Sequence, residues 1–285
     1  MGRCASWRRV SFAGWWSVTD PVRLLVATPV DGIPQAAKVS YGHAVAVGRL
    51  LASSGVETLI PDMALMAYPS DLVRARSRAV TQARLKKATH VLWLDDDNIP
   101  KAGAIEAMIQ SGHDFIGCPY PRKRIHWERF QDPGNWAADE PERIAYDYAY
   151  HHSDGPAGRQ SVAVVDGCLP VRRLSMGCML TSVRALDAMW EHYKPELWFT
   201  DVVDGGHWAC VALFQLMMGE TTKQHGTPFR ALFSEDYSFC ERYARMNEAR
   251  PELGFGPLQM LVSHPADHAG MYLFRGMSEG LVYAQ

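Results

Sequence analysis

The sequence predicts an α/β fold in which a mixed, doubly wound sheet is flanked by helices. Short apolar runs alternate with amphipathic segments through about the first 120 of 285 residues. Turn-forming Gly, Pro and Asp residues close these runs. In sheets of this kind, ligands bind beyond the carboxyl ends of the strands. The residues that follow each predicted strand are therefore the first candidates for a functional site.

The N-terminal part supplies two predicted strands and two predicted helices. Apolar runs that stop at turn signals predict the strands, and apolar spacing of three and four residues predicts the helices. Ser70 or Asp71 can cap the second helix. The four elements in chain order are a strand at 23–30, a helix at 40–54, a strand at 56–61 and a helix at 70–88.

The alternation continues and then weakens. Residues 121–170 are polar and rich in Tyr, Gly and Pro, so we expect loop or a small hairpin there. Ser234 precedes two acidic residues, which is typical of a helix start. The other expected elements are a strand at 89–95, a helix at 101–112, a strand at 114–120, a Gly turn leading into a helix at 175–193, a helix at 233–246 and, within 261–276, a loop with two histidines followed by an apolar strand-like run.

Composition limits the class of protein. A hydrophobic content of 47% with 21% charged residues is ordinary for a globular chain, and a net charge of -2 argues against a broad nucleic-acid-binding face. Six scattered cysteines without a CxxC pair argue against a zinc ribbon or a disulfide scaffold, so we expect a cytoplasmic location. No apolar stretch approaches about 20 residues, so no transmembrane segment is expected. We expect a disordered leader at 1–20 and one domain at 21–285.

Three consecutive carboxylates follow the predicted strand at 89–95. Asp95, Asp96 and Asp97 repel one another unless water or a cation screens them. Oxygen ligands at a strand end suit a hard divalent cation, Mn²⁺ or Mg²⁺, which such sites share with substrate phosphates. A solvated acidic loop is the alternative, and the triplet alone leaves both interpretations open.

Two further groups of residues carry possible chemistry. Glu235 and Asp236 supply a base for deprotonating a hydroxyl, although capping and compensation of the helix dipole explain acidic residues there equally well. His264 and His268 are spaced as in an HxxxH pair, but Pro265 argues against a helical metal site. A single histidine reaching a metal from a loop, or an exposed structural histidine, remains open for each.

Taken in order, seven segments resemble the GT-A-fold nucleotide-sugar glycosyltransferases, in particular the small family-2-like enzymes of bacteria and phages. The likeness spans about residues 22–276 and implies a nucleotide-binding half at 21–120 and an acceptor and catalytic half at 121–285. The VLWLDDDNIP segment is similar to the strand that ends in the family's DxD motif, and FSEDYSFCERYARM is similar to its Glu-Asp segment. The other five are VATPVDG, SDLVRARSRAV, GCPYPRK, LSMGCMLTSVRALDAM and HAGMYLFRG.

The resemblance implies a metal-dependent transfer of a sugar from a nucleotide-diphosphate donor, UDP by default, to a hydroxyl acceptor on a glycan, a lipid-linked molecule or a protein. Asp236 would be the base of an inverting transfer, with Glu235 as its alternative. The implied Mn²⁺ or Mg²⁺ ligands are Asp95, Asp97 and His268, with Asp95 also near the ribose or a bridging water and His264 as the fallback histidine. The implied donor-binding and sugar-binding residues are Thr28, Pro29, Asp31, Arg76, Asp95, Asp96 and Gly177.

The sequence departs from the family pattern at four positions. Arg172 and Arg173 stand where a more acidic or neutral lead-in is common, which affects the expected acceptor side. Ser77 stands where the family has Asn, and Cys178 stands where Phe is usual, which affects the expected donor contacts.

Two alternatives to a glycosyltransferase remain open. A nucleotidyltransferase shares the acidic metal site but starts with a Gly-rich phosphate loop, which ATPVDGIPQ is not. A non-catalytic nucleotide-binding or sugar-binding protein of the same fold is the other.

Overall fold

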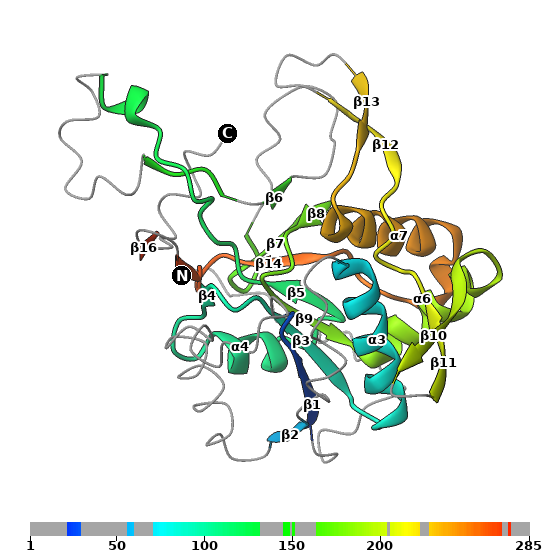
Figure 1. Ribbon diagram of the computed structural model, residues 1–285. Coiled ribbons are helices and arrows are strands. Elements are labelled where there is room, and N and C mark those ends of the chain that lie inside the picture. Colours follow the sequence, from blue (N-terminus) through cyan, green and yellow to red (C-terminus); the bar gives the residue numbers. More distant parts are fainter. Residues whose placement is uncertain are drawn as a thin grey trace, which may run out of the picture.

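The computed structural model describes nine stretches of the chain, and its centre is a mixed sheet (Figure 1). The predicted leader at 1–20, the predicted helix at 40–54 and Asp31 lie outside these stretches. The described residues are 22–29, 56–59, 71–131, 145–148, 150–151, 164–203, 206–222, 228–269 and 273–274.

The described part of the central sheet has seven strands in the order β2-β1-β3-β9-β5-β14-β7. β2, β1 and β3 run parallel, as do β5 and β14, whereas β9 and β7 run antiparallel to their neighbours. The strands are β1 (Val22–Ala27), β2 (Val56–Leu59), β3 (His90–Leu94), β5 (Phe115–Gly117), β7 (Cys168–Pro170), β9 (Cys178–Ser182) and β14 (Gln259–Leu261). The mixed α/β class expected from the sequence is confirmed.

Helices cover both faces of this sheet. α3 (Leu72–Leu85), α6 (Val183–Leu197) and α7 (Glu235–Ala249) pack on one face, and α4 (Ala104–Gln110) packs on the other (Figure 1). Asp71 caps α3 as predicted, since its side chain accepts a hydrogen bond from the Arg74 backbone N–H at 2.9 Å.

Alternation along the strands divides the core between these two faces. In β3, Val91 and Trp93 join the cluster under α3, α6 and α7, whereas Leu92 and Leu94 join the cluster under α4. A strand that is buried on both faces reads as an unbroken apolar run, which explains the VLWL sequence. The polar residues that follow Leu94 mark the point where the chain leaves the core.

Two expectations need correction. The segment predicted as a turn and a helix at 175–193 contains β9, which lies between β3 and β5 in the sheet, and the helix starts only at Val183. A five-residue buried strand and the start of a helix are both apolar, so periodicity does not separate them. The second correction concerns His268, which was expected in a loop and lies in the short strand β15 (Asp267–Ala269).

Smaller sheets lie beside the central one. β4 (Asn98–Ile99) pairs with β15, which pairs with β16 (Leu273–Phe274). The hairpins are β10 (Trp198–Val203) with β11 (Gly206–Val211), and β12 (Met218–Thr222) with β13 (Pro228–Leu232). β6 (Tyr150–His151) pairs with β8 (Arg173–Leu174), and the short helices are η1 (Trp127–Gln131) and η3 (Pro251–Leu253). None of the helices in the described stretches has the length and apolar character needed to cross a bilayer.

Candidate functional site

The acidic triplet forms a turn at the carboxyl end of β3, as predicted. The Asp95 backbone N–H donates to the Gly177 carbonyl at 3.0 Å, and the Asn98 N–H donates to the Asp95 carbonyl at 3.1 Å. Asn98 then starts β4, and its register partner in β15 is His268. This pairing of two short strands brings a residue from near the C-terminus to the acidic turn.

Three nitrogen-bearing side chains contact the Asp97 carboxylate. Its Oδ1 lies 3.4 Å from His268 Nε2 and accepts from Asn98 Nδ2 at 3.2 Å, while Lys123 Nζ forms an ion pair with its Oδ2. Burial alone would raise the pKa of Asp97, but the contacts from His268 and Lys123 outweigh burial and lower that pKa to about 2. Asp97 is therefore a carboxylate at every physiological pH.

The partner of the other ring nitrogen fixes the tautomer of His268. His268 Nδ1 lies 2.8 Å from the Pro121 carbonyl oxygen. A carbonyl only accepts, so Nδ1 carries the proton, and in the neutral imidazole Nε2 presents a lone pair to Asp97 Oδ1. Two acceptors facing each other at 3.4 Å call for a proton or a metal ion between them. Histidine ligands of metals usually have this second hydrogen bond to a carbonyl.

Asp95 has a different environment. Arg76 Nη2 lies 3.4 Å from its Oδ1, and Arg76 Nη1 donates to Glu235 Oε1 at 3.2 Å. The Arg76 side chain is only 4% exposed, so it links the acidic turn to the start of α7 from inside the protein. Burial raises the pKa of Asp95, Arg76 opposes this, and the negative charges of Asp97 and Asp236 add to the rise. Asp95 thus lies in a region of excess negative charge.

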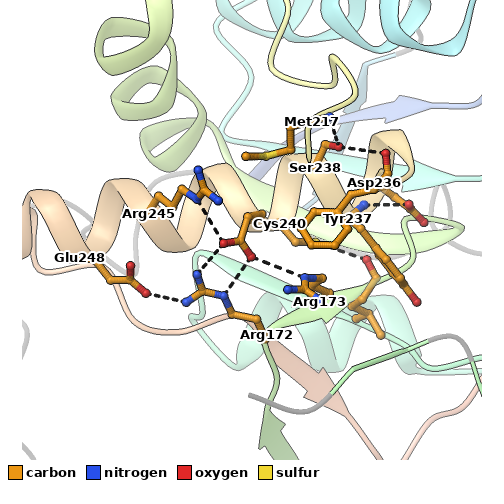
Figure 2. Close-up of polar contacts among 12 residues, drawn as sticks. Arg172, Arg173, Met217, Asp236, Tyr237, Ser238, Cys240, Arg245 and Glu248 are labelled. Atoms are coloured by element: carbon orange, nitrogen blue, oxygen red, sulfur yellow. Dashed lines mark hydrogen bonds and ion pairs between the residues drawn. The ribbon is translucent and has the colours of Figure 1, made fainter. Parts of the chain in front are cut away.

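Asp236 lies in the first turn of α7, where Figure 2 shows it next to Tyr237. Its Oδ1 accepts from the Ser234 hydroxyl and from the Tyr237 backbone N–H, the latter at 2.7 Å. Ser234 is the N-cap residue by position, but its hydroxyl bonds Asp236 and makes no capping bond. No donor in the described residues bonds Asp236 Oδ2. Of the two acidic residues at this helix start, Glu235 is held by Arg76 and Asp236 keeps an open oxygen.

The backbone at Gly177 lies close against the side chains of Asn98 and Tyr120 and holds them at the acidic turn. Gly177 N–H donates to the Tyr120 hydroxyl at 3.2 Å, and a Cβ at position 177 would lie 2.3 Å from Asn98 Nδ2. Only glycine fits there without displacing Asn98 or Tyr120. The Tyr120 ring also contacts the His268 ring edge to face, with centroids 5.0 Å apart.

The predicted set of three metal ligands is assembled only in part. Within the described stretches, no group of three or more His, Cys, Asp or Glu side chains is arranged to hold a metal ion. Asp97 and His268 meet, whereas Asp95 binds Arg76. Adjacent ligands of an octahedral Mg²⁺ lie about 3 Å apart. The Asp97–His268 pair therefore fits a hard divalent cation that takes its remaining ligands from phosphate and water.

The structure places the other predicted site residues as follows. Thr28 and Pro29 directly follow β1, whose last residue pairs with Trp93 of β3, so they lie at the same sheet edge as the acidic turn. Asp96 lies close enough to raise the pKa of Asp95 by its charge. His264 bonds Ser263 at 2.9 Å and lies near Gly103, so the structure brings His268, and not His264, to Asp97.

Two residues at the site were not predicted. Asn98 is fully buried beside Asp97, and its Oδ1 has no hydrogen-bond partner among the described residues. Tyr120 is buried, and burial together with the charges of Asp95 and Asp236 raises its pKa well above the ordinary value. The signal for Asn98 was its place directly after the triplet, and for Tyr120 its place after a strand end.

The chain matches no protein-family model and no curated protein. Among solved structures, it is similar to the crystal structure of A197 from STIV, at 12% sequence identity and a TM-score of 0.39. That likeness covers 87% of this chain and 86% of the other. A TM-score this low supports no inference about fold or function.

Proposed function

We propose that this protein is a metal-dependent glycosyltransferase of the GT-A type, which transfers a sugar from a nucleotide-diphosphate donor to a hydroxyl acceptor. The observation that carries the proposal is the facing pair of Asp97 Oδ1 and His268 Nε2, 3.4 Å apart at the carboxyl end of a central strand. A carboxylate at a strand end and a tautomer-fixed imidazole are together suited to a divalent cation. UDP is the default nucleotide.

In this proposal, the role of each residue follows from its position at the site. Asp97 and His268 would hold Mn²⁺ or Mg²⁺, which neutralises charge on the leaving diphosphate when it is bound. Arg76 holds Asp95 and Glu235 in place from the protein interior, at 3.4 and 3.2 Å. Thr28 and Pro29 line the nucleoside side of the same sheet edge in this proposal.

Asp236 serves as the base. Its Oδ1 is held by Ser234 and Tyr237, which orients Oδ2 toward a hydroxyl that enters the site. Glu235 is less suited, because its Oε1 already accepts from Arg76 at 3.2 Å. Asp236 takes the proton of the acceptor hydroxyl as that oxygen attacks the anomeric carbon, and the bond from this carbon to the diphosphate oxygen breaks, so that the nucleoside diphosphate leaves with the electron pair. In one displacement, this inverts the configuration.

Thermal-shift and calorimetric titrations of UDP, GDP, CDP, dTDP and ADP, each with and without Mn²⁺, test the proposal. We expect one nucleotide to stabilise the protein only with Mn²⁺, by about 2.7 kcal/mol at one hundred times its dissociation constant. Asp97→Asn and His268→Ala should abolish that shift. Asp187→Asn is the control, since Asp187 is a 48% exposed carboxylate that pairs with Arg84.

Donor turnover separates the enzyme from its alternatives. With the nucleotide identified, we expect release of the nucleoside diphosphate from the matching sugar donors, and Asp236→Asn should reduce its rate by at least about a hundredfold while leaving nucleotide affinity intact. Release of pyrophosphate from a nucleoside triphosphate would instead indicate a nucleotidyltransferase. Metal-dependent binding without turnover of any donor would indicate a non-catalytic binding protein, and metal-independent binding would exclude the proposed metal site.

A further inference from the structure

Lys123 occupies a position at the site that the roles above do not use. Its ammonium forms an ion pair with Asp97 Oδ2, the oxygen that does not face His268. The Lys123 and Asp97 side chains are 38% and 35% exposed, so the pair is open to solvent on one side. Both Asp97 oxygens therefore contact a nitrogen group in the structure.

The backbone that precedes Lys123 is fixed. The Pro121 carbonyl accepts from His268 Nδ1 at 2.8 Å, and the Arg122 N–H donates to the Asp147 carbonyl at 2.7 Å. The Pro119 carbonyl accepts from the Ala266 N–H at 2.9 Å. An ammonium on a flexible four-carbon stem that is anchored this way changes partner by side-chain rotation alone.

We propose that Lys123 is an exchangeable cation, which neutralises Asp97 in the free protein and binds the diphosphate once a divalent ion takes Asp97. This inference rests on the proposed function and names a residue that contacts the leaving group. The charge balance supports it. Asp95, Asp96 and Asp236 lie near one another, with Arg76 paired to Asp95, so negative charge is in excess beside Asp97. An Asp97 without a cation would add to that excess, while a bound diphosphate brings new negative charge within reach of the same ammonium.

Calorimetry on the full chain tests the exchange in two titrations, one of Mn²⁺ alone and one of UDP at saturating Mn²⁺. Lys123→Ala should bind Mn²⁺ about two to five times more tightly, because the competing ion pair is gone. It should bind UDP at least about ten times more weakly, because a charge-assisted contact is lost. Lys123→Met keeps an unbranched side chain of nearly the same length without the charge, and should behave as Lys123→Ala does.

Lys101→Ala is the matched control. Lys101 is 40% exposed and pairs with Asp267 at 2.5 Å, next to His268, so its removal changes the local charge equally without touching Asp97. We expect both of its affinities to stay within about twofold of wild type. A Lys123→Ala variant with unchanged Mn²⁺ affinity, or with unchanged UDP affinity, overturns the exchange. If wild-type protein binds neither Mn²⁺ nor any Mn²⁺-dependent nucleoside diphosphate, the proposed function itself fails.

Discussion

Replacing Gly177 by alanine tests the close approach that holds the candidate site. A Cβ at this position would lie 2.3 Å from Asn98 Nδ2 and 2.7 Å from the Tyr120 hydroxyl oxygen. Both distances are much shorter than an ordinary van der Waals contact of 3.4–4 Å. The neighbours must therefore move by about 1 Å. Asn98 is fully buried and Tyr120 is 7% exposed, so neither has open space to move into.

Two effects are expected from Gly177→Ala. Overpacking of this kind costs about 1–3 kcal/mol of unfolding free energy. At about 2–4 °C per kcal/mol for a chain of this size class, a cost of about 2 kcal/mol lowers Tm by about 4–8 °C. Moving Asn98 also removes the 3.2 Å hydrogen bond that holds Asp97 Oδ1. We expect the Mn²⁺-dependent nucleotide affinity to fall at least about tenfold, or about 1.4 kcal/mol.

Thermal denaturation and calorimetric titration of purified protein measure both effects. Gly256→Ala is the control, because a Cβ there meets nothing within 4 Å and its φ lies outside the left-handed region. That variant should be neutral or more stable by about 0.4–1 kcal/mol. If Gly177→Ala keeps the wild-type Tm and affinity, the close approach is not what holds Asp97. If only Tm falls, Asn98 does not transmit the strain to the site.

Three other substitutions probe the framework. Glu241 is 7% exposed and bonds Arg172 at 2.8 Å. Burial alone would raise its pKa, but its arginine contacts lower that pKa to about 2 from 4.5. Glu241→Gln should therefore cost about 3 kcal/mol of unfolding free energy at pH 7, and urea denaturation should show this difference closing as the pH falls from 4.5 toward 2. Phe214→Ala should cost about 3–5 kcal/mol in the same assay, because Phe214 is buried and contacts Trp93 edge to face at 5.2 Å; a loss under 1 kcal/mol would refute that packing. Ser182→Ala should cost about 1 kcal/mol, because the Ser182 hydroxyl caps α6, and an unchanged urea midpoint would refute the cap.

Local sequence patterns determined the central-sheet strands of the first 120 residues and the presence of the four helices that cover the central sheet. The apolar runs gave β1, β3 and β5, and the helical spacing with its Asp71 cap gave α3. These signals are local because burial on one face or both imposes a period on the chain itself. The same reasoning placed the acidic triplet correctly at a strand's carboxyl end, since an apolar run that stops abruptly marks where the core stops.

Tertiary structure alone decided which residues meet there. His268 reaches Asp97 because β4 pairs with β15, and Arg76 meets Glu235 because α3 and α7 pack on one face of the sheet. Such contacts join positions more than 150 residues apart, as the 159-residue separation of Arg76 and Glu235 illustrates. No local period encodes them, because they depend on strand order and register. That His268 rather than His264 lies beside Asp97, and that Glu235 rather than Asp236 pairs with Arg76, follows from that order.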